Sequence, residues 1–515
     1  MNDSTPTPIV RAAPVLGVAL LLGLLADYLF RSAGEPTVAF FLWPLVLAVA
    51  VVMLRRRTGT LSTEAAVLLG LGLLSAAVHI WRDAPALRLL AFWATAAAFA
   101  LAAFHGGAAW IRRSGVVRYA ASVAGTALHT AFGPFLTLGD VDWSSIRGES
   151  APASRWRRAA PVARGLLLAV PLLVVFGGLF ASADPVFAAM LDDLARIDPE
   201  QVAGHVLLTG FFAWIATGYA RGFLTGTAVP LPPAVTRLRP WLGITEVGVV
   251  LGLLSALFAA FVAVQFRYLF GGGTLVEVTP GLTYAEYARR GFFELVAVAA
   301  LTLPVLLAAD WLLRRERPRD ERIFRVLAGA QIVLLAAVMT SAFTRMRLYL
   351  EAYGLTEQRF YATSFLAWLA FVLAWLAVTI LRGRREQFAF GALVSAFVLL
   401  AALVLVNPDA RIARTNLARA AVSPDALEAF DASYAASLSA DAVPVLVPAL
   451  PDLHPAARCQ IARRVLRRWG PEQERDWRSW SVSTARARAV VRAHEAELRS
   501  ALGPDGGCRA TSPGA

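Results

Sequence analysis

The stretch YAEYARRGFFELVAVAALTLPVLLAADWLL, residues Tyr284–Leu313, decides the fold class. Its first third is aromatic and charged. Its remainder is an apolar segment long enough to cross a hydrocarbon core of ~30 Å as a helix. Glu294 stands about one helical turn inside the apolar part, and Arg314 and Arg315 follow its end. The stretch therefore predicts a membrane-spanning helix with unusual polar residues at one rim of the membrane.

The composition of the whole chain also indicates a membrane protein. Of its 515 residues, 57% are hydrophobic and only 17% are charged, and the mean hydropathy is +0.59. A soluble domain carries about 25% charged residues. The net charge of +13 raises the question of nucleic-acid binding. Most arginines, however, cluster at the ends of apolar blocks, as the positive-inside rule predicts. We therefore expect a lipid bilayer as partner and no nucleic acid.

The basic residues exclude several enzyme classes. All 49 of them are arginine, so the chain has no lysine for a Walker A loop, a kinase strand or a pyridoxal Schiff base. The six histidines have no ligand spacing, and the two cysteines match no metal motif. We expect no cofactor, no metal and no catalytic residue, and an enzymatic activity stays an open alternative with little support.

The apolar blocks predict an all-α, polytopic transmembrane bundle of about eleven spans. Arg55, Arg56 and Arg57 end the second block, which places that end and the N-terminus in the cytoplasm and the C-terminus outside. We expect this topology in a bacterial inner membrane. The expected spans are Ala12–Phe30, Thr37–Leu54, Leu61–Trp81, Leu89–Ile111, Gly165–Ala183, Val202–Phe223, Leu242–Phe266, Gly291–Leu313, Ile323–Phe343, Phe360–Leu381 and Phe388–Val406.

Four regions follow from this pattern. Residues 1–113 form a four-helix transmembrane region, and 165–406 form a seven-helix core. Between them, 114–164 is expected to stay cytoplasmic, because arginines flank the apolar segment Val116–Leu138 on both sides and favour an interfacial helix. Residues 407–515 form an extracytoplasmic tail of short helices with a disordered end, beginning with Asn407 as N-cap and Pro408 as first helical residue.

The two cysteines, Cys459 and Cys508, both lie in this tail. They could pair if the tail is extracytoplasmic, because disulfides persist in oxidising compartments. Two unrelated thiols are an equally good interpretation of the sequence.

Several blocks resemble a bacterial membrane-protein family of unknown function, domain-of-unknown-function 4173 and its relative 4153. They are QFRYLFGG (Gln265–Gly272), YAEYARRGFFELVAVAALTLPVLL (Tyr284–Leu307), RLYLEAYGLTEQRFYA (Arg347–Ala362), NPDARIARTNL (Asn407–Leu417) and SADAVPVL (Ser439–Leu446). The resemblance covers about half of the chain. It implies a multi-pass inner-membrane protein with no known activity and no catalytic residues to transfer.

Polar residues gather on three outer segments and form the candidate site. Helical spacing places Tyr287, Arg290 and Glu294 on one face, and it does the same for Arg345, Tyr349 and Tyr353. A carboxylate inside lipid costs about 2–3 kcal/mol unless it is paired or hydrated, so Glu294 is expected to face the bundle interior against an arginine. The candidate residues are Glu294, Arg290, Tyr287, Arg345, Tyr349, Tyr353, Arg359, Gln265 and Arg267.

Two interpretations of this cluster remain open. It could line a polar cavity that binds an anionic lipid or a small anionic solute, since arginine forms bidentate hydrogen bonds with phosphate and carboxylate. It could equally be an aromatic belt with snorkelling arginines and one structural ion pair. The first interpretation favours a transporter or a lipid-handling protein. The alternative function is a scaffold or sensor whose tail binds a periplasmic protein, which the sequence does not identify.

Overall fold

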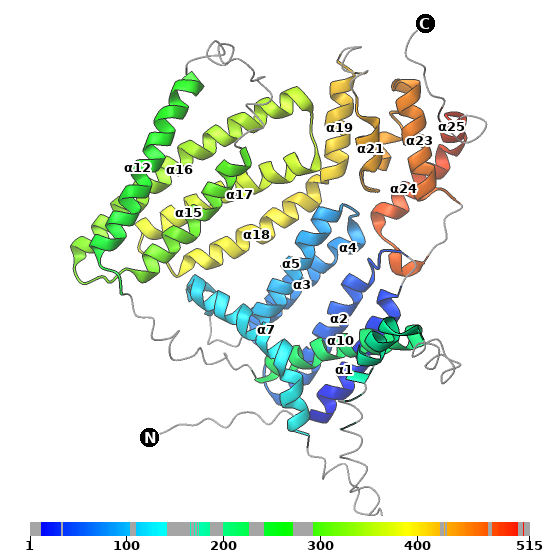
Figure 1. Cartoon of the computed structure of the whole chain (residues 1–515), viewed down its shortest axis with the longest axis horizontal. Helices are drawn as coiled ribbons and strands as arrows, with labels where there is room; N and C mark the ends of the chain where they lie inside the picture. Colours follow the sequence, from blue (N-terminus) through cyan, green and yellow to red (C-terminus); the bar gives the residue numbers. More distant parts are fainter. Residues whose placement is uncertain are drawn as a thin grey trace, which may run out of the picture.

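The computed structural model describes residues 12–31, 34–103, 110–141, 172–173, 175–185, 199–225, 241–270, 292–422, 430–471 and 476–502, together with the single positions 165, 169, 427 and 508. Every regular element in these ranges is helical, and one isolated bridge joins Leu242 to Leu313. The predicted all-α fold is confirmed. Its helices fall into two membrane groups and a tail, which Figure 1 shows as separate clusters of ribbon.

Ten helices in the described residues are long and apolar enough to cross a membrane. This is close to the expected number of about eleven. Of the remaining expected span, Gly165–Ala183, the structure describes residues 165, 169, 172, 173 and 175–183, and each of these is helical. The membrane helices are α1 (Ala12–Phe30), α2 (Ala39–Thr58), α3 (Thr63–Ala76) continued by α4 (Val78–Trp81), α5 (Pro85–Ala102), α10 (Pro199–Thr225), α12 (Ile244–Phe270), α15 (Phe292–Leu312), α16 (Pro318–Tyr353), α17 (Glu357–Leu381) and α18 (Gln387–Val406).

The first membrane group packs α1, α2, α3, α5 and α10 around one apolar core that includes the fully buried Phe223. Small residues let its helices approach closely, as is common in membranes. A Cβ added at Gly23 of α1 would lie 3.0 Å from the Cβ of Ala213 in α10. Near the start of α10, His205 contacts Asp27 of α1 at 2.5 Å.

Two short elements follow α5. They are α6 (Trp110–Arg113) and α7 (Val116–Gly139), and α7 is the segment expected to lie on the membrane surface. Its Thr126 hydroxyl donates to the carbonyl of Ala100, near the last residue of α5, and Arg221 near the end of α10 pairs with Asp140 at 2.5 Å. It therefore packs against the last residues of α5 and along the second half of α10.

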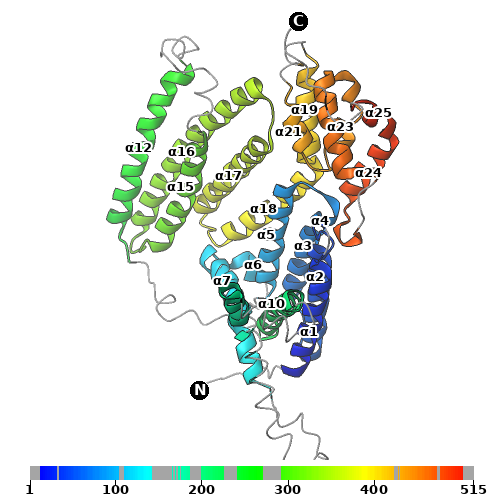
Figure 2. The ribbon, with the colours of Figure 1, turned by 45° about the vertical axis from the view of Figure 1, so that its right-hand side comes forward.

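The second group contains α12, α15, α16 and α17, and its core includes Leu306, Phe324, Leu335 and Leu366. Helix α18 runs between the two groups in both views (Figure 1, Figure 2). Near the C-terminal end of α15, Asp310 accepts from Arg315 at 2.7 Å and lies 2.9 Å from Arg385. This cluster ties the α15–α16 turn to the start of α18.

Helix α16 is longer than the predicted span. The span was predicted to end at Phe343, whereas the helix continues to Tyr353 because its charged outer part keeps helical hydrogen bonds beyond the apolar block. The glycine Gly354 then ends it with φ of 74°, a backbone conformation that favours glycine. The extension carries Arg345, Tyr349 and Tyr353 on one continuous helix, as the spacing predicts.

The tail folds around its own apolar core, centred on Ile412, Leu446, Ile461 and Val491. Its helices are α19 (Pro408–Ala420), α21 (Ala432–Ser437), α22 (Val443–Leu446), α23 (Pro455–Trp469), α24 (Val482–Ala493) and α25 (Glu495–Ser500). Pro408 is the first residue of α19, as predicted, but the Asn407 side chain makes no capping hydrogen bond. Asn407 instead ends α18 in the left-handed conformation, with φ of 55°.

Candidate functional site

The structure brings two of the predicted polar residues into direct contact. Gln265, near the outer end of α12, accepts a hydrogen bond from Nη2 of Arg345 at 2.9 Å and one from the Ser341 hydroxyl at 3.2 Å. Both Gln265 and Arg345 are 9% exposed. This pair joins α12 to α16 inside the bundle, so its position indicates a structural role.

A second group of predicted residues forms a stack at the outer end of α16. The Arg359 guanidinium lies 4.0 Å from the ring centre of Tyr349 and 5.8 Å from that of Tyr353. Its Nη1 donates to the carbonyls of Tyr353 and Gly354 at 3.1 and 2.7 Å. The aromatic rings and carbonyls therefore hold the guanidinium in one orientation.

This stack forms one wall of a cavity of about 520 Å³, which we call the rim cavity. Its lining comes from α15, α16, the start of α17 and the tail: Phe292, Met346, Tyr349, Thr356, Glu357, Gln358, Arg359 and Tyr434. Burial raises the pKa of Tyr434 to about 12, so its hydroxyl stays protonated at neutral pH. That oxygen accepts from the Glu357 amide at 2.7 Å, and its proton remains able to donate toward the cavity.

The other predicted residues do not join this cavity. Glu294 is exposed in the first turn of α15, against our expectation that it faces the bundle interior. Its expected partner Arg290 and the neighbouring Tyr287 lie outside the described residues, as does the side chain of Arg267. Of the nine candidates, Tyr349 and Arg359 line the rim cavity, and Tyr353 supports Arg359 from outside it.

A further buried ionic network in the described part of the chain was not predicted from the sequence. It joins the turn between α4 and α5 to the tail, and we call it the tail latch: Arg82, Asp83, Arg88 and Asp441. Asp441 accepts from Nη1 of Arg82 at 3.1 Å and from the Asp83 amide at 2.7 Å. Asp83 accepts from Nη2 of Arg88 at 2.7 Å and from the Ala440 amide at 2.8 Å.

The tail latch is largely removed from water. Arg82 and Arg88 are each 8% exposed, and Asp441 is 4% exposed. Each member has more than one polar partner, and the Ser483 hydroxyl adds a bond of 2.6 Å to Asp441. Buried charges are tolerated when they are paired and hydrogen-bonded in this way. The latch therefore fixes the tail on the turn between α4 and α5.

The sequence carried a signal for this network. Three sequence motifs supply the charged residues of this region. They are RDAPALR at the α4–α5 turn, with Arg82 and Asp83, NPDARIARTNL at α19, with Asp409, and SADAVPVL at α22, with Asp441. The last two motifs were among the blocks that resemble the family. Acidic residues in these apolar motifs indicate that each carboxylate has a buried partner. The contact between Asp83 and Asp441, which are 358 residues apart, cannot be inferred from spacing alone.

Asp409 lies beside the tail latch and is fully buried. Its Oδ2 accepts from the Ser439 amide at 3.0 Å, while Oδ1 has no hydrogen-bond partner in the structure. Burial raises the pKa of the Asp409 carboxyl, and the nearby charges of Asp441 and Asp83 raise it further. The protonated form is thus favoured in the folded tail.

We expect Asp409 to make tail stability depend on pH. Because its folded pKa lies above the unfolded value of about 3.9, its contribution is complete below that pH and is lost as the pH rises through the folded pKa. Hydrogen exchange of the Ser439 amide should therefore become faster as the pH rises above the unfolded pKa of about 3.9, after correction for intrinsic exchange.

The matched variants are Asp409→Asn and Asp452→Asn. Asparagine keeps an acceptor for the Ser439 amide without a charge, so Asp409→Asn should flatten this dependence. Asp452 is exposed in the same tail, and its variant should keep the wild-type slope. Equal slopes for the two variants would refute the role of Asp409.

The tail also supplies one wall of the rim cavity. The Asn416 side chain of α19 donates to the Leu355 carbonyl at 2.8 Å and accepts from the Leu355 amide at 2.9 Å. Nη1 of Arg419 donates to the Leu350 carbonyl at 2.6 Å. These bonds hold the α16–α17 turn against the tail, so the position of Tyr434 in the cavity depends on docking.

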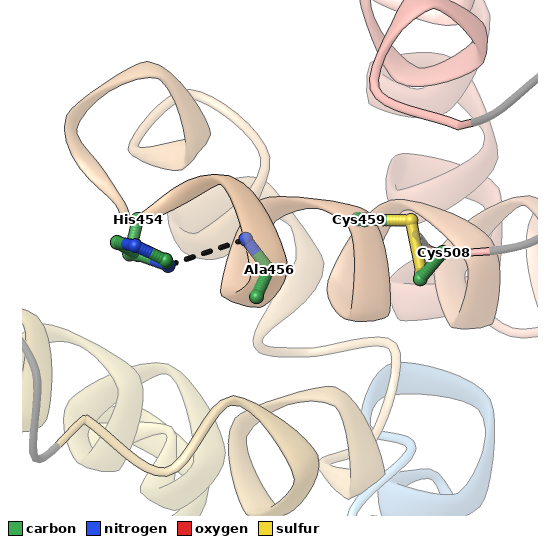
Figure 3. The surroundings of a disulfide bond; sticks show 4 residues. All are labelled: His454, Ala456, Cys459 and Cys508. Carbon is green, nitrogen blue, oxygen red and sulfur yellow. Dashed lines mark hydrogen bonds between the residues drawn. A yellow bond between two sulfur atoms is a disulfide. The ribbon is translucent and has the colours of Figure 1, made fainter. Parts of the chain in front are cut away.

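The two cysteines form a disulfide. Cys459 of α23 is bonded to Cys508, with 5.6 Å between their Cα atoms, and Figure 3 shows the bond on the same helix whose first turn His454 caps. Of the two interpretations left open by the sequence, the structure supports pairing. The bond joins the last described residue to a helix in the tail core.

Among the described residues, no group of three or more histidine, cysteine, aspartate or glutamate side chains is arranged to hold a metal ion. The rim cavity offers instead one oriented guanidinium and one phenol donor beside the apolar Phe292 and Met346. The Glu357 carboxyl is also part of its lining. The guanidinium and the phenol can bind an anion by charge-assisted hydrogen bonds.

Residues 65–449 match the family model described as Domain of unknown function (DUF4153). The match covers most of the chain, and the chain belongs to this family, in agreement with the resemblance seen in its sequence. It begins in α3, so α1 and α2 lie before it, and it covers the later membrane helices and most of the first half of the tail, including every member of the tail latch. No curated protein and no solved structure matched in the same comparisons.

Proposed function

We propose that this integral membrane protein is a lipid-handling or transport protein whose rim cavity binds an anionic group from the extracytoplasmic side. The observation that carries the proposal is the fixed orientation of Arg359 in the cavity wall. Its two hydrogen bonds to carbonyls use Nη1 alone, so Nε and Nη2 have no hydrogen bond to any described residue. These two donors fit the parallel oxygens of a phosphate or carboxylate.

The proposed topology places the N-terminus in the cytoplasm and the tail outside, in a bacterial inner membrane. The disulfide supports an oxidising compartment for the tail, and the arginine clusters support the opposite side for the helix ends that carry them. The scaffold alternative receives less support, because the family motifs of the tail face the membrane helices rather than an outside partner.

Replacing Arg359 by alanine tests the proposal. We expect binding of dihexanoyl phosphatidylglycerol or inorganic phosphate to weaken by about 10- to 150-fold, since a hydrogen bond to a charged group contributes about 1.5–3 kcal/mol. The measurement is titration of the purified full chain by native mass spectrometry for the lipid and by calorimetry for phosphate. A loss for the lipid alone would identify a headgroup site, and a loss for both would identify a general anion site.

The control variant is Arg414→Ala, which removes an exposed arginine of α19 away from the cavity lining. Arg359→Lys keeps the charge and loses the planar pair of donors, so it should fall between the wild type and Arg359→Ala. If Arg359→Ala binds both probes as well as Arg414→Ala does, the rim cavity is not an anion site.

A further inference from the structure

The outward face of α18 forms the floor of a long trough between the two membrane groups. Phe390, Val394 and Val398 follow one another at four-residue spacing, and they line clefts on both sides of the helix. The cleft against α17 has a volume of about 690 Å³, and the cleft against α3 one of about 920 Å³. Val394 and Val398 are 42% and 61% exposed. One helix face therefore separates two adjoining grooves.

The walls of both grooves are apolar. Trp368, Phe371 and Trp375 of α17 line the first, and Val67 and Leu71 of α3 line the second. Along α18 the lining extends from Gln387 to Ala402, which is about 22 Å at 1.5 Å per residue. This length exceeds half of a hydrocarbon core of ~30 Å. The two grooves can each hold one acyl chain of the same leaflet.

Charged groups stand at one end of the trough only. Arg112 of α6 lines both grooves, with its guanidinium 5.8 Å from the ring centre of Phe390, and Glu64 of α3 lines the second groove. Neither side chain forms an ion pair with another described residue. The arginine pattern assigns this end to the cytoplasm, because Arg113 and the Arg55–Arg57 cluster lie at the same ends of their helices.

We infer that the trough is a binding site for a two-chain zwitterionic phospholipid of the cytoplasmic leaflet. Its phosphate binds Arg112 where the two grooves meet, its ammonium group binds Glu64, and its acyl chains lie on either side of the Phe390–Val394–Val398 face. A single cation shared by two grooves fits one phosphate bearing two chains. The neighbouring carboxylate of Glu64 attracts the ammonium group of a zwitterionic headgroup and repels a headgroup that carries only negative charge. The site is independent of the rim cavity, which lies at the opposite membrane face.

The test is native mass spectrometry of the delipidated full chain with phosphatidylethanolamine and phosphatidylglycerol of equal chain length. The wild type should retain phosphatidylethanolamine at least tenfold better than phosphatidylglycerol. Arg112→Ala should weaken both lipids at least tenfold, and Glu64→Gln should remove the preference between them. Val394→Trp should displace both lipids by filling the trough while leaving its charged end intact.

The control is Arg113→Ala, which removes the adjacent exposed arginine that lines neither groove. Arg113→Ala should retain both lipids as the wild type does, and so should Arg359→Ala in the rim cavity. The trough and the rim cavity can therefore be tested separately. The inference is overturned if Arg112→Ala and Val394→Trp retain lipid as well as Arg113→Ala does. A wild type that prefers phosphatidylglycerol, or a preference that survives Glu64→Gln, overturns the headgroup assignment.

Discussion

Replacing Asp441 by alanine is expected to weaken docking of the tail by about 3–5 kcal/mol, the usual effect of removing one partner from a buried ion pair. The change leaves Arg82 buried without its counter-charge, and it removes the acceptor of the Asp83 amide and of the Ser483 hydroxyl. Hydrogen exchange at the Asp83 and Ala440 amides should accelerate between about a hundredfold and several thousandfold. Both amides are hydrogen-bonded only across the docked interface.

The matched control is Asp452→Ala. Asp452 is an exposed aspartate of the same tail, so its removal should leave both amides as protected as in the wild type. Exchange in Asp441→Ala that stays at the Asp452→Ala level would show that the latch does not hold the tail.

A double variant separates charge from packing. Arg82→Leu combined with Asp441→Leu removes the uncompensated charge, and apolar replacements of buried pairs are often tolerated. We therefore expect the double variant to dock better than Asp441→Ala alone. A double variant that docks worse would assign the effect to the lost contacts of Arg82, including its bond to the Val404 carbonyl.

Removing the disulfide is expected to lower the stability of the tail by about 4 kcal/mol in the chain-entropy model for a loop of this length. The bond closes 49 residues of chain. Cys508→Ser should lower the unfolding temperature of the tail, and reduction of the wild type should give the same value. Cys459→Ser should cost more, because Cys459 is 5% exposed and a serine there would bury a hydroxyl.

Reductant serves as the internal control for this prediction. It should have no further effect on Cys508→Ser, and a further loss would point to another reducible group. In intact cells, a thiol-specific reagent should modify neither cysteine before reduction. Free thiols in such cells would contradict both the pairing and the proposed extracytoplasmic position of the tail.

The membrane helices could be predicted closely because lipid imposes a simple rule. A chain in hydrocarbon must satisfy its backbone hydrogen bonds within the segment, so long apolar blocks become helices. The blocks Phe360–Leu381 and Phe388–Val406 correspond to α17 and α18 within a few residues. Helix α16 was predicted too short. Hydropathy shows which residues suit lipid, whereas the helical hydrogen bonds of α16 continue beyond the apolar residues to Tyr353.

The candidate site could be predicted only in part, and the reason is geometric. Tyr349 and Tyr353 share a helix face through local spacing, which a sequence shows directly. The rim cavity also needs Tyr434, a tail residue whose place depends on how the tail docks. Glu294 was assigned to the interior from the cost of a charge in lipid, yet its residue is exposed in the first turn of α15.

The tail latch also has a consequence for the order in which the protein is made. Asp83 and Asp441 are 358 residues apart, and at about 5–20 residues per second a ribosome needs roughly 20–70 s to add the second after the first. During that interval the α4–α5 turn lacks this acceptor and is held by its own Arg88–Asp83 pair. A chain truncated before Ser439 would insert its helices and still leave Arg82 open to water. Completion of the tail is therefore the last step of assembly, and it closes the outer end of the molecule.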